Sequence, residues 1–381
     1  MVRANQRQDP GVLCPVSAAS INRASSIWFS RPTAAATASF AAVTFFIGLV
    51  GLAFLPGEAN RLIDPQYVSV THCIDMGLGR PTVSVYWSIA RFGMPGWKHH
   101  LAVHSPNDSS KSLVFPCRQL RPLSLAKGAD ADHALVGNWD GSIYSIDLRF
   151  PDVEPACIAR QPDGAVVALA ASADGESVLS QSAFYLHAWD PATRSERWRR
   201  SDVAPYCFAL RPDNSAVIIG TSQGELLEVD LHTGRSRRSI ANFHRPLLAI
   251  SLSADGAKLA ALQANDRISL LDSATGDRLW NEQVIRSSLT AAGRIVSFSA
   301  NGTLLVTAGQ ERSGRSLAVW SVATGQKVCE LRGHDNVVIG AAFTHSGRLR
   351  SWGADGTIRD WNLVAGIADR FATLSPPPID S

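Results

Sequence analysis

The chain has 381 residues, of which 45% are hydrophobic and 18% are charged, so it can bury a large core and is not disordered as a whole. Its formal net charge of +3 gives no reason to expect a nucleic-acid partner, because phosphate binding needs a concentrated basic face. The six cysteines include no CxxC pair, which argues against a zinc site or a thioredoxin-like motif.

An uncharged apolar segment, AAATASFAAVTFFIGLVGLAFL, covers residues 34–55 and has no internal proline. As a helix at ~1.5 Å per residue it would be about 33 Å long, which is enough to cross the hydrocarbon core of a bilayer. It also lacks the polar stripe of a buried helix in a soluble protein. We therefore expect a flexible tail over residues 1–33 and a transmembrane helix over residues 34–55. The alternative is a signal peptide cleaved near residues 57–59, with export of the rest.

The charges that flank this segment predict its orientation. Four arginines and a single aspartate precede it, and the residues just after it are of mixed charge: Arg3, Arg7, Arg23, Arg31 and Asp9 come before, and Glu58, Arg61 and Asp64 come after. Because positive residues stay on the cytoplasmic side, we expect a cytoplasmic N-terminus and an extracytoplasmic remainder.

Residues 56–118 form a region with four apolar runs, QYVSVTHCI, TVSVYWSIA, HHLAVH and SLVFPC. They fit either a juxtamembrane segment or an irregular first member of the repeat array that follows. Cys73 and Cys117 could close a loop here in an oxidising compartment, but unpaired thiols are the favoured interpretation. The histidines His99, His100 and His104 lack nearby acidic or thiol donors, so no metal site is predicted.

A repeating unit occupies residues 119–375, and residues 376–381 form a C-terminal tail. Each unit consists of short β-type runs that end in an aliphatic residue or Trp followed by a small polar residue. These end markers are Asp147, Asp190, Asp230, Asp272, Ser321 and Asn362, spaced 40 to 49 residues apart. The longest spacing contains an extra polar loop, QERSGRS, at residues 310–316. A period of ~40–45 residues with several strands per unit is typical of a β-propeller blade.

The last unit divides into four strands, at residues 336–343, 348–352, 357–363 and 370–374. Asp-Gly and Ser-Gly pairs separate the runs, and we interpret the Asp-Gly pairs as primed hairpin turns, in which Gly takes the positive φ. Six units are clear, and the four runs of the preceding region would supply a seventh. The sequence therefore predicts an all-β propeller, most consistent with seven four-stranded blades, of which one is irregular.

The last unit, LRGHDNVVIGAAFTHSGRLRSWGADGTIRDWNL, resembles a WD40 repeat almost position for position. Several units, such as LLDSATGDRLW and AWDPATRSERW, also resemble the repeats of quinoprotein-like propellers. The WD40 resemblance implies a buried hydrogen-bonded chain made of His334, Ser351, Asp355 and Trp361. A buried Asp and a buried His must be paired, so these four residues are interpreted as structural and not as catalytic.

Seven arginines of two neighbouring units form a possible interaction patch. They are Arg194, Arg197, Arg199 and Arg200 on one outermost strand and Arg235, Arg237 and Arg238 on the next. The favoured alternative is that edge strands carry charge to block aggregation. As a docking surface for an acidic partner, these side chains should point to solvent and bind in a salt-dependent way. Arg200 falls on the opposite face of its strand and is left out of the patch.

The sequence thus predicts a membrane-anchored propeller that binds a protein or peptide partner and is not an enzyme. We expect no cofactor, no metal, no catalytic residue, no nucleic acid and no small-molecule substrate. The alternative function is that of a quinoprotein-like propeller, either a degenerate oxidoreductase or an envelope-assembly scaffold. Fold alone does not decide between them.

Overall fold

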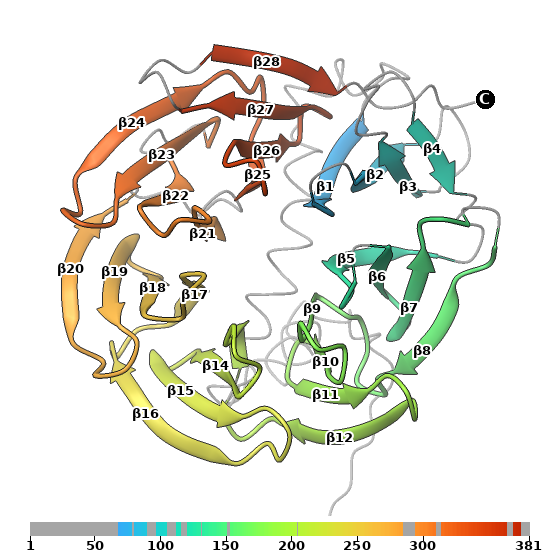
Figure 1. Cartoon of the computed structure of the whole chain (residues 1–381), viewed down its shortest axis with the longest axis horizontal. Helices are drawn as coiled ribbons and strands as arrows, with labels where there is room; N and C mark the ends of the chain where they lie inside the picture. The colour runs from blue at the N-terminus through green and yellow to red at the C-terminus, as the bar shows by residue number, and fades with distance from the viewer. Residues whose placement is uncertain are drawn as a thin grey trace, which may run out of the picture.

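The computed structural model describes residues 68–77, 80–89, 97–104, 112–115, 120–130, 132–150, 153–203, 205–284, 294–309, 314–363 and 369–374. These residues form seven antiparallel sheets of four strands each, arranged as blades around a central axis (Figure 1). The predicted seven-bladed, all-β propeller is confirmed. The predicted transmembrane helix at residues 34–55 lies outside the described residues. Among the residues that are described, no helix has the length and apolar character needed to cross a membrane.

The first blade is formed by part of the region that the sequence left open between a blade and a juxtamembrane segment. It contains β1 (Val68–Asp75), β2 (Thr82–Ile89), β3 (Trp97–His104) and β4 (Ser112–Phe115). The second and third blades contain β5 (Pro122–Lys127), β6 (His133–Asn138), β7 (Ser142–Asp147), β8 (Ala156–Arg160), β9 (Ala168–Ala171), β10 (Val178–Gln181), β11 (Leu186–Asp190) and β12 (Ser195–Arg200).

The fourth and fifth blades contain β13 (Pro205–Leu210), β14 (Ala216–Thr221), β15 (Glu225–Asp230), β16 (Ser236–Asn242), β17 (Leu247–Leu252), β18 (Lys258–Gln263), β19 (Arg267–Asp272) and β20 (Arg278–Gln283). The sixth and seventh contain β21 (Val296–Phe298), β22 (Leu304–Ala308), β23 (Ser316–Ser321), β24 (Lys327–Arg332), β25 (Val338–Phe343), β26 (Leu349–Gly353), β27 (Ile358–Asn362) and β28 (Asp369–Leu374). In each blade the strands follow chain order, with the first strand innermost in the ring (Figure 1).

The burial of a strand depends on its place in the blade. The second strand of the fourth blade, β14, is AVIIGT, and all six of its residues are buried. The outermost strand of the same blade, β16, is SRRSIAN, and four of its residues are exposed. A second strand is covered on both faces by the neighbouring blades, so it is a continuous apolar run. An outer strand faces solvent and is polar, which also protects the sheet edge from pairing with other chains.

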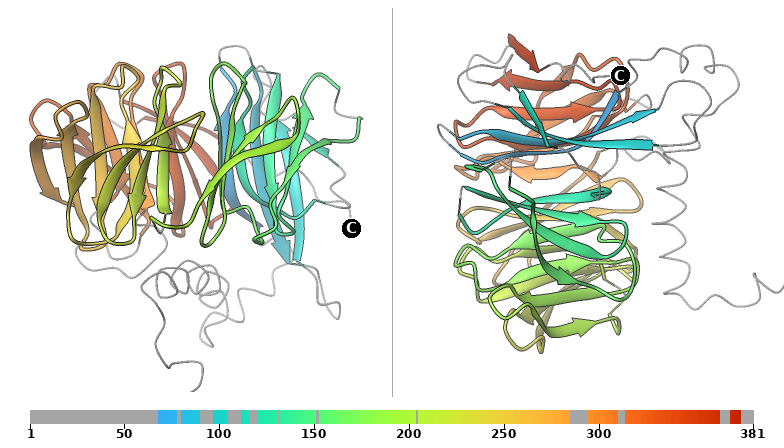
Figure 2. Two further views of the ribbon diagram at one scale, coloured as in Figure 1. Left: turned by 90° about the horizontal axis from the view of Figure 1, so that it is seen from below. Right: turned by 90° about the vertical axis from the view of Figure 1, so that its right-hand side faces the viewer.

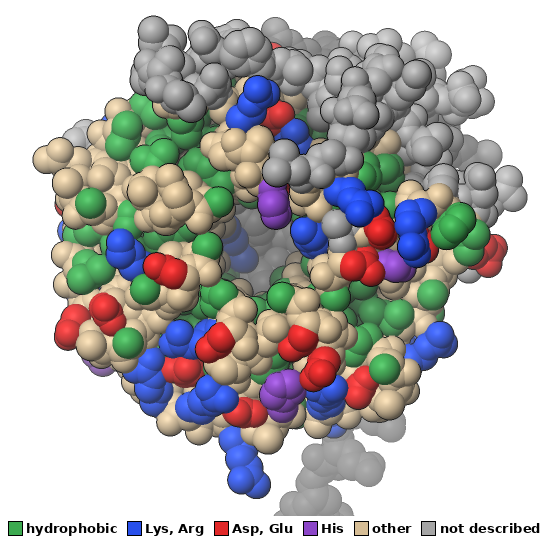
Figure 3. All heavy atoms as spheres, in the orientation of Figure 1, with side chains coloured by type: hydrophobic (Ala, Val, Ile, Leu, Met, Phe, Trp, Pro, Cys, Tyr) green, Lys and Arg blue, Asp and Glu red, His purple; other side chains and the backbone are tan. Residues whose placement is uncertain are grey.

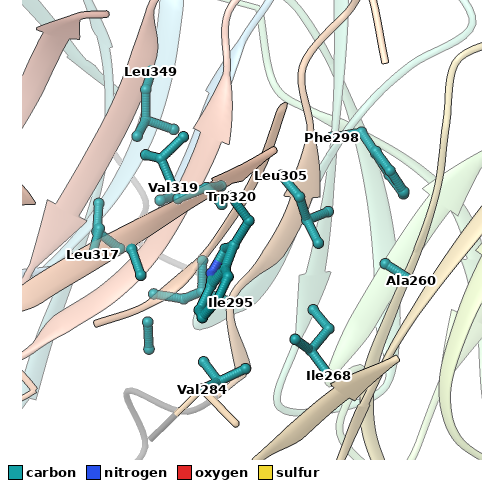
Figure 4. Close-up of a cluster of buried hydrophobic side chains, with 14 of the residues drawn as sticks. Ala260, Ile268, Val284, Ile295, Phe298, Leu305, Leu317, Val319, Trp320 and Leu349 are labelled. Atoms are coloured by element: carbon teal, nitrogen blue, oxygen red, sulfur yellow. The ribbon is translucent and has the colours of Figure 1, made fainter. Parts of the chain in front are cut away.

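The hydrophobic core consists of clusters between the faces of adjacent blades. The largest cluster joins the fifth, sixth and seventh blades, where Trp320 of β23 packs between Ile268 of β19 and Leu349 of β26 (Figure 4). Other clusters fill the remaining inter-blade faces. The disc is therefore held together by side-by-side packing of blades, and no single blade has a core of its own.

The ring closes between the seventh and first blades, and this joint contains both apolar and polar contacts. Its apolar cluster contains four buried residues, Cys73, Tyr86, Ala102 and Ile358. Arg350 of β26 pairs with Asp360 at 2.6 Å and donates to the Thr82 hydroxyl of the first blade. The backbone N–H of His345 donates to Asp75 Oδ2 at 3.0 Å. Cys73 is a buried free thiol, whereas Cys117 lies outside the described residues.

The alternating strand direction gives the disc two different faces (Figure 2). We call one the loop face, because it carries the connections between blades, such as residues 161–167, and the turns between second and third strands, such as residues 182–185. The turn face carries the turns between first and second strands, such as residues 172–177, and those between third and fourth strands. The first strand of every blade starts at the loop face, so β1 begins there at Val68.

The glycine-containing turns of the turn face differ from the predicted primed type. Ser172 and Ser177 bracket one such loop, with a backbone bond of 2.9 Å, and Gly175 at φ +76 is its positive-φ residue. A type I′ turn needs positive φ at both central residues, but Asp174 does not have it. Instead, Asp174 accepts from the Ser172 hydroxyl and from the N–H of Glu176. The position of Gly was predicted correctly, but the turn type was wrong.

Candidate interaction surfaces

The four residues that the WD40 resemblance singles out lie together in the seventh blade. His334, in the loop before β25, has Nδ1 2.8 Å from Asp355 Oδ2 and Nε2 2.7 Å from Ser351 Oγ. The indole N–H of Trp361 donates to Ser351 Oγ at 2.9 Å. A carboxylate can only accept, so His334 donates from Nδ1 and accepts the Ser351 hydroxyl at Nε2. The chain of bonds ties the inter-blade loop to β26 and β27.

Asp355 is the charged end of this chain and is held as a carboxylate. Its side chain is 6% exposed, and it also accepts from Thr357 Oγ1 at 2.8 Å and from the Asp335 N–H at 3.0 Å. Burial alone would raise the pKa of Asp355, but the hydrogen bonds from His334 and Thr357 outweigh it and hold the pKa at about 2. These bonds join the loop before β25 to the turn between β26 and β27, so the geometry is that of a structural clamp.

Two of the degenerate blades keep part of the same chain with different residues. In the third blade Trp189 Nε1 donates to Ser180 Oγ at 2.8 Å, and Ser180 donates to Gln161 Oε1 at 2.8 Å. Gln161 thus takes the place of the histidine. Its distance along the sequence to the tryptophan is 28 residues, against 27 from His334 to Trp361, and this spacing was the available signal. In the sixth blade Trp320 donates to Thr307 Oγ1 at 2.9 Å.

The first blade contains a related network around His104. Its Nε2 lies 2.7 Å from Ser84 Oγ and 3.1 Å from Tyr86 Oη, and the imidazole is buried. Burial, and then the nearby Arg350, lower the pKa of His104 to about 4, so the ring is neutral at pH 7. The side chains of His99 and His100 lie outside the described residues. Where side chains are described, no group of three or more His, Cys, Asp and Glu could hold a metal ion.

A second recurring contact joins the outer strands of neighbouring blades. Trp198 of β12 donates from Nε1 to the Leu231 carbonyl at 2.8 Å, and Trp280 of β20 donates to the Val322 carbonyl at 2.9 Å. Leu231 and Val322 each follow the marker residue of the next blade. In the fourth blade Arg238 replaces the tryptophan and donates from Nη2 to the Ser273 carbonyl at 2.7 Å.

Arg238 also belongs to an ion cluster around Glu228, whose side chain is 9% exposed, while that of Arg238 is 37% exposed. Its Nε donates to Glu228 Oε2 at 2.7 Å, while Arg211 Nε donates to Glu228 Oε1 at 2.9 Å. Burial would raise the pKa of Glu228, but its hydrogen bonds to Arg238 and Arg211 lower it below the usual value. Arg238 is therefore only partly directed to solvent, contrary to the expectation, because its guanidinium also joins the fourth blade to the fifth.

Comparison with known proteins identifies the repeats. The family model described as outer membrane protein assembly factor BamB matches residues 151–354, which is more than half of the chain. The chain belongs to this family. It resembles an uncharacterized WD repeat-containing protein of Synechocystis sp., with 29% identity over 142 residues, covering 35% of this chain and 38% of that protein. It also resembles apoptotic protease-activating factor 1 of Mus musculus, with 32% identity over 97 residues, covering 25% of this chain and 7% of that protein.

The chain spans only 38% and 7% of the lengths of these two curated relatives, so the two matches support the type of repeat that the chain contains. Together with the seven-bladed ring, the matches show that this BamB-family protein is a WD40-like and quinoprotein-like propeller. A propeller fold with matches of this kind supports a role as an interaction scaffold.

The other arginines of the predicted patch are mostly paired within their own blade. Arg197 lies 3.1 Å from Asp190, and Arg237 lies 2.7 Å from Asp230. Arg199, 53% exposed, has nitrogens 3.8 Å from Glu196 and 3.9 Å from Asp163. Arg194 and Arg235 are exposed, and Arg194 occupies a positive-φ turn position, with φ 57. The structure brings the two strands side by side, but most of the positive charge is balanced locally.

Figure 3 looks onto the turn face of this propeller and shows acidic and basic side chains interspersed around a central opening. Many of the acids cap their own turns. Asp190, Asp230 and Asp272 each accept backbone N–H bonds from the second and third residues after them. These hydrogen bonds, with Arg237 first for Asp230, lower the pKa of each carboxyl group. The acids are therefore parts of the turns, and the face as a whole has no single-sign field.

Large apolar side chains are exposed at three places among the described residues. On the turn face, the loop after β7 exposes Phe150 by 57% and Val153 by 62%. On the loop face, Trp139, Val167 and Phe184 are exposed by 44%, 42% and 45%. On the outer wall, Leu279 and Val328 are exposed by 51% and 57%. The sequence analysis singled out none of these seven residues, because an exposed apolar residue has no periodic signature.

Proposed function

We propose that this BamB-family chain is a membrane-anchored propeller that serves as a protein–protein interaction platform on the extracytoplasmic side. The observation that carries the proposal is a rigid, closed disc that leaves Phe150 and Val153 exposed together on one loop of the turn face. Rigid scaffolds with exposed loops are the usual carriers of binding sites. The matching family is described as an assembly factor, which supports a role in holding other proteins.

The described residues of the loop after β7 make local contacts that suit binding. Val153 N–H donates to the Phe150 carbonyl at 3.1 Å, and Phe150 N–H donates to the Asp147 carbonyl at 3.3 Å. The guanidinium of Arg149 lies 5.6 Å from the centre of the Phe150 ring and is also paired with Asp147 at 2.7 Å. An aromatic ring held in place beside an arginine is the type of residue pair that dominates interface energetics. Because these contacts hold Phe150 and Val153 in place, a partner would lose little free energy in ordering the two side chains.

The membrane anchor and the side of the membrane rest on the sequence. Residues 34–55 are apolar and uncharged, and the arginines before them favour a cytoplasmic N-terminus. Cleavage after this segment would instead release the propeller on the same side of the membrane. Protease protection in intact cells distinguishes these outcomes. An anchored, extracytoplasmic propeller is cut from outside and stays in the membrane fraction, whereas a propeller that is shielded in intact cells contradicts the orientation.

We also propose that the chain is not an enzyme. The buried ion pairs of the described residues, His334 with Asp355, Arg211 with Glu228 and Arg350 with Asp360, are all used to join strands or blades. The alternative, a degenerate quinoprotein-type oxidoreductase, predicts redox turnover after incubation with a quinone cofactor. A cofactor reconstitution assay with an artificial electron acceptor tests this directly, and turnover above that of a heat-denatured control would contradict the proposal.

The interaction role is tested by affinity capture from solubilised membranes with quantitative mass spectrometry. The chains compared are wild type, Phe150→Ala with Val153→Ala, and the control Val328→Ala, which removes an equally exposed apolar side chain from the outer strand β24. If the loop contains a hot spot worth about 2 kcal/mol, the double substitution weakens binding about 30-fold and removes a defined set of partners. Equal recovery of the same partners with all three chains would show that this loop is not the binding surface.

A further inference from the structure

Three exposed apolar side chains form a strip across the second and third blades on the loop face. We call Trp139, Val167 and Phe184 the loop-face patch. Trp139 lies in the turn between β6 and β7, Val167 just before β9, and Phe184 in the turn between β10 and β11. Each is between 42% and 45% exposed. All three positions belong to connections on the same face of the disc.

Backbone hydrogen bonds hold the three positions in fixed relation. Val166 N–H donates to the Asn138 carbonyl at 2.9 Å, and Val167 N–H donates to the Gln181 carbonyl at 2.8 Å. The inter-blade loop of residues 161–167 is thus fastened to both neighbouring turns. Below it, Asp163 Oδ2 lies 3.3 Å from Nε2 of His187, and the His187 side chain is fully buried. The patch is therefore a preformed surface.

The path of the chain places this patch on the side of the proposed anchor. The first strand of the ring begins at Val68 on the loop face, and the apolar segment ends at Leu55. The intervening residues, 56–67, can span at most about 43 Å even when fully extended, at ~3.6 Å per residue. An anchor at residues 34–55 therefore keeps the disc close to the bilayer. The chain that leads from this anchor enters the disc at its loop face.

We propose that the loop-face patch rests on the membrane surface, with Trp139 and Phe184 at the level of the lipid headgroups. The inference depends on the anchor of the proposed function and adds which face of the disc meets the lipid. Aromatic side chains with an apolar body favour this interfacial layer. The turn face, with Phe150 and Val153, is then directed away from the bilayer and is accessible to protein partners.

The charges around the patch indicate that the contact is apolar and not electrostatic. Arg160, 66% exposed, pairs with Asp140 at 2.7 Å. Arg199 lies beside Glu196 and Asp163 and over the ring of Tyr185. Each of these arginines has a carboxylate beside it. One further arginine, Arg121, is exposed next to Trp139, whose N–H donates to its carbonyl at 3.2 Å. A single such cation is not a concentrated positive field that would select anionic lipid. Contact with a zwitterionic bilayer should therefore persist at high salt.

The experiment uses the full-length chain reconstituted in phosphatidylcholine vesicles. An environment-sensitive fluorescent amino acid replaces Trp139, Phe184 or, as a matched control, Phe150, which is 57% exposed on the opposite face. All three positions are exposed, so thermal melts should match that of the unlabelled chain. Quenching is measured with lipids brominated in the acyl chains and with aqueous iodide, at about 0.1 M and about 1 M salt, where the Debye length falls from ~10 Å to ~3 Å.

The proposal expects the reporters at residues 139 and 184 to emit at shorter wavelength, to be quenched by brominated lipid and to be shielded from iodide at both salt concentrations. The reporter at residue 150 should be open to iodide and unaffected by brominated lipid. Iodide access at residues 139 and 184 in an anchored chain overturns the inference and leaves the anchor intact. Shielding without lipid quenching also overturns it, because a second copy or a protein then covers the patch. A chain that separates from the vesicles on flotation contradicts both the anchor and the inference.

Discussion

Replacing Arg238 tests whether the fourth and fifth blades are joined by a guanidinium. In Arg238→Ala, Glu228 keeps its bond from Arg211 but loses the 2.7 Å bond from Arg238 Nε. The Ser273 carbonyl loses its 2.7 Å bond from Arg238 and keeps the longer, 3.4 Å bond from Arg211 Nη2. A hydrogen bond to a charged group contributes about 1.5–3 kcal/mol, while removing one partner of a fully buried pair costs about 3–5 kcal/mol. Because Arg211 remains and the Arg238 side chain is 37% exposed, we expect a loss of about 1–2 kcal/mol. At an unfolding entropy of ~2.1 cal/mol/K per residue, this loss lowers the Tm by about 2–3 °C in a domain of roughly 300 residues.

The neighbouring residue on the same strand is the matched control. Arg237 is also paired with a carboxylate of its own blade, and its side chain is about as exposed as that of Arg238, but its partner Asp230 is more exposed than Glu228, at 24% against 9%, and keeps its turn hydrogen bonds without the arginine. An exposed pair of this kind contributes less than about 1 kcal/mol. Thermal and urea unfolding followed by near-UV circular dichroism compares Arg237→Ala, Arg238→Ala and Arg238→Lys. The lysine keeps the charge but not the two-pronged donor, so its stability should fall between wild type and Arg238→Ala. Equal, small effects at positions 237 and 238 would refute the inter-blade role.

Three further outcomes follow from the structure. Asp355→Ala should destabilise the seventh blade by about 1–3 kcal/mol, because His334 and the Asp335 N–H lose their acceptor, and an unchanged melt would show that the network adds nothing. The pKa of Asp355 in the folded protein, about 2, lies below the unfolded value of 3.8. The ionised carboxylate therefore stabilises the fold above about pH 4, and this contribution is lost as the pH falls toward 2. The difference in unfolding free energy between wild type and Asp355→Asn should shrink over that range. Gly325→Ala should lower the Tm more than Gly347→Ala. Both glycines have φ near +70, but a Cβ at Gly325 would lie 2.9 Å from Trp280, whereas no atom lies within 4 Å of a Cβ at Gly347. Equal melting temperatures would show that the φ strain alone determines the loss of stability.

The blade array was predictable because two local signals agree in most of the repeats. Apolar runs of strand length recur at a nearly constant spacing, and glycine turns separate them, as at Gly175, Gly256 and Gly302. The first blade was harder to recognise, because its turns lack the repeated Ser-Ala-Asp-Gly pattern. Its four apolar runs correspond nonetheless to β1 through β4. The number of blades followed from the number of such runs, since a ring without a gap leaves no sheet edge exposed.

The inter-blade contacts could not be predicted, because different side chains donate the equivalent hydrogen bond to the next blade. Trp198, Arg238 and Trp280 occupy one structural position, and nothing in local composition marks an arginine as a substitute for tryptophan. The glycines that face these side chains, such as Gly234, are explained only by the three-dimensional structure. A Cβ at Gly234 would meet the Trp198 ring at 2.7 Å, so glycine is required there. Arg194 takes the same turn position in the third blade, where the second blade presents no such tryptophan.

The placement of the arginines changes how this propeller can bind. Positive charge at the edge of a sheet is available to a partner only when it is not already neutralised, and here Arg197, Arg237 and Arg238 each face a carboxylate within 3.1 Å. Long-range attraction from these strands is therefore weak, and their charges serve the turns and the blade joints. What the two faces expose instead is apolar area, at Phe150 and Val153 on one side and at the loop-face patch on the other. Because the chain reaches the ring from the loop face, a bilayer and a protein partner would not compete for the same surface, and a single rigid disc can hold both at once.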